Sequence, residues 1–98
     1  MNYVFDLDGT LCTNTNSNYA TAQPLIERIN IVNRLYDEGN KITIYTARGM
    51  KSGNNNILKA YIKYYFFTKK QLKLWNIKYH HLFLGKPYDF LIGLITIF

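Results

Sequence analysis

The segment NYVFDL at 2–7 is a short, almost continuously apolar run that contains Asp6 and is followed at once by Asp8. Such a run is typical of a strand buried on both faces, as in parallel sheets. Further apolar, strand-like runs follow at 41–46, 80–84 and 88–98, and the first three runs are separated by stretches with helical periodicity. The order strand, helix, strand, helix, strand, strand predicts an α/β domain built on a parallel sheet with right-handed crossovers.

The first helix is expected to begin at Pro24 and to end before Gly39. Proline suits the first helical position, and glycine suits the left-handed residue that follows a helix. Apolar residues between them recur at helical spacing and predict one buried face: Leu25, Ile29, Val32 and Tyr36. The polar stretch at 12–23 is expected to be a loop.

The second helical stretch follows three asparagines at 54–56, which offer a cap. Thr68 and Gln71 have the spacing of a capping box, which predicts that a helix restarts there and ends at Asn76. The expected inner face combines a stripe before this restart with two residues after it: Leu58, Tyr61 or Ile62, and Tyr65, then Leu72 and Trp75.

The length of 98 residues suits one small domain over 1–98, and a hydrophobic content of 48% argues against disorder. The single cysteine, Cys12, cannot form an internal disulfide, so we expect a cytoplasmic protein in which Cys12 is a packing residue. The longest apolar stretch, 90–98, is too short to span a bilayer, and we expect no membrane partner.

Charge is unevenly distributed along the chain. Residues 1–40 hold five acids and two arginines, whereas residues 41–98 hold ten basic residues and one acid. A basic half favours an anionic partner, either a phosphate ester or a nucleic acid. We disfavour nucleic acid because the sequence contains no recognition motif.

The acids Asp6 and Asp8 carry the most specific chemistry in the sequence. Residues two apart on a strand point to the same side, so both carboxylates would enter one small volume. They could bind a divalent metal there, or divide into a nucleophile and a proton donor. Gly9 permits a tight turn, and the amides from Thr10 onward could hold an anion. An isolated pair of such acids would more often be a solvated turn.

FDLDGTL at 5–11 resembles motif I of the haloacid dehalogenase (HAD) superfamily of phosphohydrolases. ITIYTARG places Thr46 where the second motif of that superfamily has a serine or threonine, and LGKP places Lys86 where its third motif has a lysine. The spacing and the neighbouring residues also resemble a subgroup of small phosphatase-like proteins that are often linked to capsule or polysaccharide synthesis. The resemblance implies a three-layer, Rossmann-like parallel sheet with flanking helices.

The resemblance also implies roles for these residues. Asp6 would attack phosphorus and form an aspartyl-phosphate, and Asp8 would protonate the leaving oxygen and then activate water. Asp6 and the backbone carbonyl of Asp8 would bind Mg²⁺. Thr46 and Lys86 would bind the phosphate of a small phosphorylated substrate such as a sugar phosphate. From its position alone, Arg48 either binds a second anionic group of the substrate or lies on the surface.

The sequence departs from the superfamily at the fourth motif, where acids that help to bind Mg²⁺ are expected. Gly93 and Leu94 stand at those positions, and Asp89 lies too early along the strand to replace them. We therefore expect weakly bound Mg²⁺, impaired activity and a C-terminally truncated fold, with 93–98 as an out-of-frame tail. The short connections also predict no cap domain.

Two alternatives to an impaired phosphatase stay open: a catalytically inactive homologue and, with less support, a basic nucleic-acid-binding module. The uncharged stretch at 90–98 also predicts self-association through the C-terminal strand.

Overall fold

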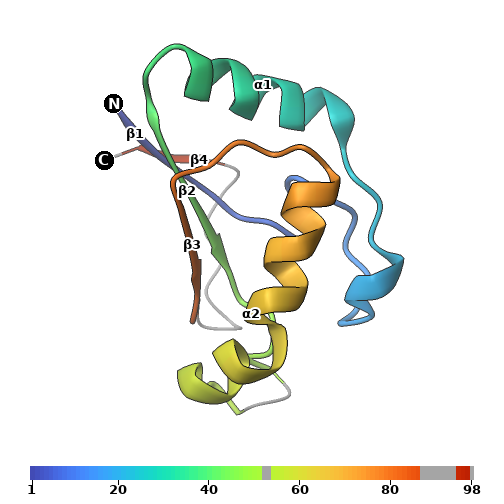
Figure 1. Ribbon diagram of the computed structural model, residues 1–98. Coiled ribbons are helices and arrows are strands. Elements are labelled where there is room, and N and C mark those ends of the chain that lie inside the picture. The colour runs from blue at the N-terminus through green and yellow to red at the C-terminus, as the bar shows by residue number, and fades with distance from the viewer. Residues whose placement is uncertain (52–53, 87–94, 98) are drawn as a thin grey trace.

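The computed structural model describes residues 1–51, 54–86 and 95–97. Within these ranges, a four-stranded sheet in the order β3-β2-β1-β4 is accompanied by two α-helices and a short 3₁₀ helix (Figure 1). Along the chain the elements are β1 (Asn2–Phe5), η1 (Tyr19–Thr21), α1 (Ile26–Asp37), β2 (Lys41–Thr46), α2 (Ile57–Leu74), β3 (His81–Leu84) and β4 (Ile95–Ile97). The predicted α/β class and the first three predicted strands are confirmed.

Strands β1, β2 and β3 pair in parallel, so their carboxyl ends meet at one edge of the sheet. Phe5 lies opposite Ile44, and Thr46 lies opposite Leu84. The chain steps outward in one direction from β1 to β3, and the connecting helices α1 and α2 lie on the same face (Figure 1). This is the arrangement that crossovers of one hand produce.

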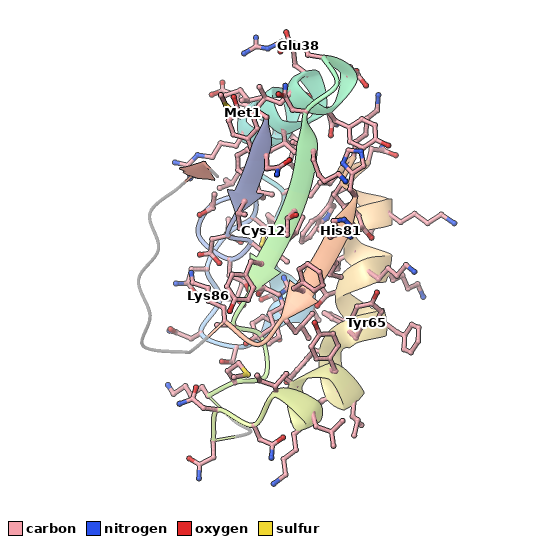
Figure 2. The ribbon with its side chains drawn as sticks, turned by 90° about the vertical axis from the view of Figure 1, so that its left-hand side faces the viewer. Met1, Cys12, Glu38, Tyr65, His81 and Lys86 are labelled. Atoms are coloured by element: carbon pink, nitrogen blue, oxygen red, sulfur yellow. The ribbon has the colours of Figure 1, made fainter. Side chains whose placement is uncertain are left out.

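The hydrophobic core fills the space between this face of the sheet and the two helices. Its fully buried members come from every layer: Leu7, Val32, Ile42, Ile44 and Leu72. Figure 2 shows the opposite face of the sheet in front of the helices. In the described part of the chain, neither α-helix covers that face, so the predicted three layers are not seen there. A helix on that opposite face would require a crossover to a parallel strand placed beyond β1, on the side away from β2.

The fourth strand differs from its prediction. β4 pairs antiparallel to β1, with Phe5 opposite Ile95 and Tyr3 opposite Ile97, whereas a parallel strand over 88–98 was expected. A parallel strand would need a crossover of about a dozen residues or more to return the chain to the amino edge. Leu84 and Ile95 are closer in sequence than that. The interpretations that depend on Asp89, Gly93 and Leu94 lie outside the described residues.

Helix α1 begins later than predicted. Its N-cap is Leu25 rather than the residue before Pro24, and Pro24 instead forms an isolated bridge with Cys12. The predicted end is confirmed, because Gly39 has a φ of 93° and its amide donates to the Tyr36 carbonyl. Left-handed glycine after the last turn closes the helix as expected.

Helix α2 is continuous through the predicted break. Asn56 caps its first turn by accepting from the Lys59 amide, as predicted, and Asn76 ends it with a φ of 57°. Thr68 and Gln71 do not restart the helix. The predicted inner face is wrong in part, because Leu58 and Ile62 are exposed while Ala60 and Thr68 are buried. Leu72 is buried as predicted. None of the helices among the described residues is long and apolar enough to cross a bilayer.

Two glycines with similar backbone angles give a matched test of this packing. Gly49 has a φ of 81°, and a Cβ there would lie 2.7 Å from Tyr64 Cδ2 and 3.0 Å from Ala60 Cα on α2. A Cβ at Gly39 would meet nothing within 4 Å. We therefore expect Gly39→Ala to cost about 1 kcal/mol of backbone strain, and Gly49→Ala about 3 kcal/mol because overpacking is added.

The midpoints of urea unfolding for the two variants measure this difference. Equal midpoints would contradict the close packing of the 46–50 turn against α2.

Candidate functional site

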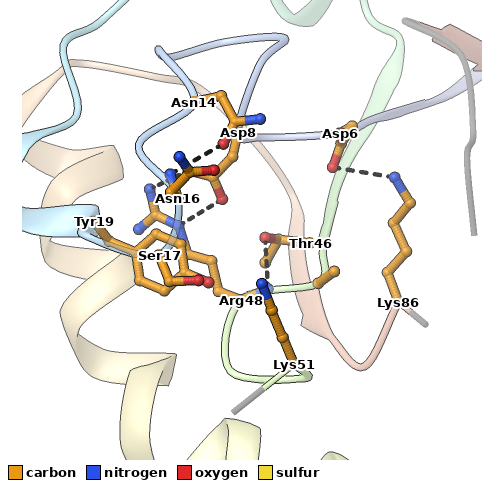
Figure 3. Close-up of a pocket in the computed structure, with 11 residues that line it drawn as sticks. Asp6, Asp8, Asn14, Asn16, Ser17, Tyr19, Thr46, Arg48, Lys51 and Lys86 are labelled. Carbon is orange, nitrogen blue, oxygen red and sulfur yellow. Dashed lines mark hydrogen bonds and ion pairs between the residues drawn. The ribbon is translucent and has the colours of Figure 1, made fainter. Parts of the chain in front are cut away.

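The turn after β1 sets the position of both acids. The Leu7 carbonyl accepts hydrogen bonds from the amides of Thr10, Leu11 and Cys12, and Gly9 at the bend has a φ of 85°. Leu7 is fully buried, and its neighbours on either side, Asp6 and Asp8, line one pocket at the carboxyl edge of the sheet (Figure 3). The sequence-based expectation that the two carboxyl groups enter one small volume is met.

Lys86 faces Asp6 across this pocket. Its Nζ lies 3.3 Å from Asp6 Oδ1, and the residue is only 5% exposed (Figure 3). Its backbone amide donates to the Thr46 carbonyl, which fixes the chain after β3 to the end of β2. Burial raises the pKa of Asp6, and the Lys86 ammonium opposes that shift. The site therefore holds a poorly solvated carboxylate with a cation at its side.

Thr46 is the last residue of β2 and is fully buried. Its hydroxyl oxygen accepts a hydrogen bond from the Arg48 amide at 3.2 Å. A hydroxyl whose oxygen is engaged in this way still has its proton to donate. Thr46 lines the same pocket as the two acids and Lys86, so four of the predicted site residues converge there.

Arg48 is buried rather than on the surface, with 1% of its area exposed. Its guanidinium makes a two-point ion pair with Asp8, from Nε to Oδ2 at 2.9 Å and from Nη2 to Oδ1 at 3.0 Å (Figure 3). Nη1 reaches α2, where it donates to Thr68 Oγ1 and to Gln71 Oε1, and Nη2 also donates to Cys12 Sγ. Arg48 lines the pocket, but its donors are directed at protein groups and not at the place of a second anionic group of a substrate.

Gln71 links this arginine to the loop at 12–23. It accepts from Arg48 at 2.6 Å through Oε1 and donates to the Tyr19 carbonyl at 2.7 Å through Nε2. The Tyr19 ring lies against the guanidinium, 4.6 Å from the arginine Cζ. Sequence reasoning missed Thr68 and Gln71 as members of the site, because their spacing matches a helix cap.

The loop supplies the remaining wall of the pocket, which has a volume of about 240 Å³. Sequence reasoning assigned no role to the loop residues that line it or to one lysine after β2: Asn14, Asn16, Ser17, Tyr19 and Lys51 (Figure 3). A weak signal was present, because asparagine and serine favour turns with left-handed residues. Asn16 and Ser17 do adopt positive φ angles.

Cys12 lies beneath the pocket as a buried thiol. Its Sγ donates to the Asp8 carboxylate at 3.4 Å and to the Leu7 carbonyl at 3.7 Å. Burial, reinforced by the charge of Asp8, raises the pKa of Cys12 to about 12. A thiol that stays protonated is a packing group rather than a nucleophile, as the sequence predicts.

The donors for a metal ion are few. Mg²⁺ prefers six oxygen ligands in octahedral geometry. Both carboxylate oxygens of Asp8 accept from Arg48, and one oxygen of Asp6 faces Lys86. Among the residues that the structure describes, no group of three or more His, Cys, Asp or Glu residues could hold a metal. The ligands that the resemblance implies, Asp6 and the backbone carbonyl of Asp8, are too few among the described residues to hold Mg²⁺ tightly, and we assign it no step.

The fold and the site together define a small α/β protein with a pocket of paired acids and bases at the carboxyl edge of its sheet. No protein-family model matches the sequence, and no curated protein matches it. A crystal structure of an MCSG target from Vibrio cholerae aligns with 94% of this chain and 78% of its own, at 29% identity and a TM-score of 0.84.

A structure of a Pnkp1/Rnl/Hen1 complex contains a chain that aligns with 92% of this one, at 18% identity and a TM-score of 0.63. This chain spans 29% of that neighbour's length. At such identity the similarity concerns the fold alone. The two neighbours therefore support the α/β architecture.

The Arg48–Asp8 pair can be tested through stability. Arg48→Ala removes a fully buried cation and leaves Asp8, Thr68 and Gln71 without their partner, so we expect a loss of about 3 kcal/mol. Arg28→Ala is the matched control, because Arg28 is exposed and also contacts the acidic turn, through the Gly9 and Thr10 carbonyls. The control should cost about 1 kcal/mol or less.

Chemical denaturation of both variants measures the two losses. A similar loss in both would show that burial of Arg48 contributes nothing beyond an ordinary surface contact.

Proposed function

We propose that this chain is a HAD-like phosphohydrolase domain that binds a small phosphorylated metabolite and uses Asp6 as its nucleophile. The observation that carries the proposal is the convergence of Asp6, Thr46 and Lys86 on one pocket, with the Lys86 ammonium 3.3 Å from the Asp6 carboxylate. Phosphoryl transfer needs positioning and charge compensation more than elaborate chemistry. These three side chains are suited to that task.

In the proposed reaction, a carboxylate oxygen of Asp6 forms a bond to phosphorus as the bond to the leaving oxygen breaks. Water then attacks phosphorus and gives a proton to Asp8, and the bond from phosphorus to Asp6 breaks, which releases phosphate and restores the Asp6 carboxylate. The Thr46 hydroxyl donates to a phosphoryl oxygen, and the Lys86 ammonium compensates the charge on the phosphoryl group. Asp8 would hand a proton to the leaving oxygen, the role that the family resemblance implies.

We further propose that turnover is impaired. Both oxygens of Asp8 are engaged by Arg48, so delivery of a proton requires this ion pair to loosen. No acid stands at 93 or 94, where the family resemblance leads us to expect metal ligands. A pocket of about 240 Å³ with asparagine, serine and tyrosine at its wall suits a small polar substrate, such as a sugar phosphate.

Hydrolysis of an aryl phosphate in the presence of Mg²⁺ tests the proposal. Asp6→Asn should reduce hydrolysis to the uncatalysed background, because an amide cannot form the acyl phosphate. Thr46→Val should lower kcat by about 100-fold, since one donor to the phosphoryl group is lost. The matched control is Asp37→Asn, at an exposed ion pair with Lys78, which should leave the rate unchanged.

A rate that survives Asp6→Asn would refute Asp6 as the nucleophile. Absence of hydrolysis in the unaltered chain would refute the phosphohydrolase proposal and favour a second candidate, a phosphate-binding protein without turnover. The two-point ion pair between Arg48 and Asp8 favours this candidate, because it engages the carboxylate that would have to deliver a proton. Calorimetric binding of inorganic phosphate, lost in Lys86→Met, would support it.

Mg²⁺ binding is a separate prediction that rests on the sequence and on the donor set. The unaltered chain should bind Mg²⁺ with a Kd of about 1 mM or weaker, because too few carboxylates are free to hold it. The double variant Gly93→Asp/Leu94→Asp should bind it about tenfold more tightly. Isothermal calorimetry measures both, and tight binding by the unaltered chain would show that the missing acids are not needed.

A further inference from the structure

Helix α2 presents an exposed face that the proposed catalytic site does not use. Leu58, Ile62 and Phe66 are 69%, 75% and 78% exposed. They are spaced four residues apart, so they form one continuous stripe along the helix. The opposite side of α2 buries Ala60, Thr68 and Leu72 against the core. Apolar side chains gathered in this way on a surface indicate an interaction site.

Lysines surround this stripe. The 18 residues of α2 include five lysines and no acid, and all five are exposed: Lys59, Lys63, Lys69, Lys70 and Lys73. Lys69 and Lys73 continue the line of the stripe by one and two turns, because they stand seven residues after Ile62 and Phe66. Long side chains that end in nitrogen project away from α2 in Figure 2.

A shallow groove lies at the lysine-rich end of the helix. It has a volume of about 570 Å³ and is lined by Phe66, Lys69, Lys70, Lys73, Ile77 and Tyr79. Three ammonium groups and two aromatic rings therefore border one concave surface. Such a surface can take an anionic group beside an apolar one.

We propose that the exposed face of α2 binds the surface of an anionic phospholipid membrane. The lysines would contact lipid phosphates while Leu58, Ile62 and Phe66 enter the boundary between headgroups and acyl chains. A helix with exposed bulky apolar residues among lysines binds membranes in this way, parallel to the surface. Surface binding needs no spanning helix. The proposal goes against the sequence-based expectation of no membrane partner.

Charge and side-chain type favour a lipid surface over two other partners, a second copy of the chain and a single-stranded nucleic acid. A second copy docked by the same face would place two sets of five lysines against each other, which repel. A single-stranded nucleic acid would also suit the lysines, and Phe66 could stack on a base. Leu58, Ile62 and Leu74 are aliphatic and highly exposed, and they offer nothing to a phosphate backbone or to base stacking. The aliphatic residues favour a lipid surface.

Co-sedimentation with lipid vesicles tests the proposal. The full chain should sediment with vesicles that contain about one third phosphatidylglycerol and should stay in solution with vesicles of phosphatidylcholine alone. Ile62→Gln/Phe66→Gln should reduce the bound fraction about tenfold, because the inserted apolar area is lost. The matched control is Ile26→Gln/Ile31→Gln, which removes two exposed isoleucines from α1 and should bind as the unaltered chain does.

Thermal unfolding of each variant shows that it is folded, and both pairs of substitutions are at exposed positions. The proposal is overturned if the chain ignores phosphatidylglycerol vesicles. It is also overturned if the α1 control loses as much binding as the α2 variant, or if a single-stranded oligonucleotide displaces the vesicles and binds both forms equally. Because the readout is sedimentation, failure here leaves the proposed phosphatase function untouched, and the reverse also holds.

Discussion

The buried ion pair between Arg48 and Asp8 is the interaction on which the rest of the site depends. It joins the turn after β1 to the turn after β2, and through Gln71 it reaches α2 and the loop at 12–23. A buried guanidinium is costly unless its donors are satisfied, and here carboxylate, hydroxyl and amide oxygens accept from it. The pocket is therefore shaped by one side chain that links the turn after β2 to three other segments. The same pair also restrains the acid that the proposed chemistry would need as a proton donor.

The strands and three site residues could be predicted from the sequence because their signals are local. Asp6, Asp8 and Thr46 each stand at or just beyond the end of an apolar run, and parallel strands bring such ends to one edge. Lys86 was predicted from the family resemblance, because a single lysine after a strand carries no specific signal by itself. The environment of Arg48 could not be predicted, because its partners are 20 to 40 positions away in sequence. Threonine and glutamine at capping spacing serve equally well as partners for a guanidinium, so the pattern of residues alone does not choose between the two roles.

The errors on α2 and β4 have a common cause, which is that tertiary contacts decide between local alternatives. α2 is apolar around much of its circumference, so its periodicity is compatible with either of two faces being buried. Packing against the core selects the face that contains Ala60 and Leu72. The other face was left exposed with its lysines. An uncharged β-prone segment such as Ile95–Ile97 can pair in either direction, and the short connection from β3 favours the antiparallel one.

In the proposed reaction, the carboxyl-edge pocket holds a phosphoryl group on Asp6. A crystal structure of the chain with beryllium fluoride and Mg²⁺ in the medium tests it most directly, because beryllium fluoride bound to a carboxylate has the shape and charge of an aspartyl-phosphate. We expect density bonded to an Asp6 carboxylate oxygen, with Thr46 Oγ1 and Lys86 Nζ within hydrogen-bonding distance of the fluorines. An unmodified Asp6 at saturating beryllium fluoride, or the anion bound elsewhere, would contradict it.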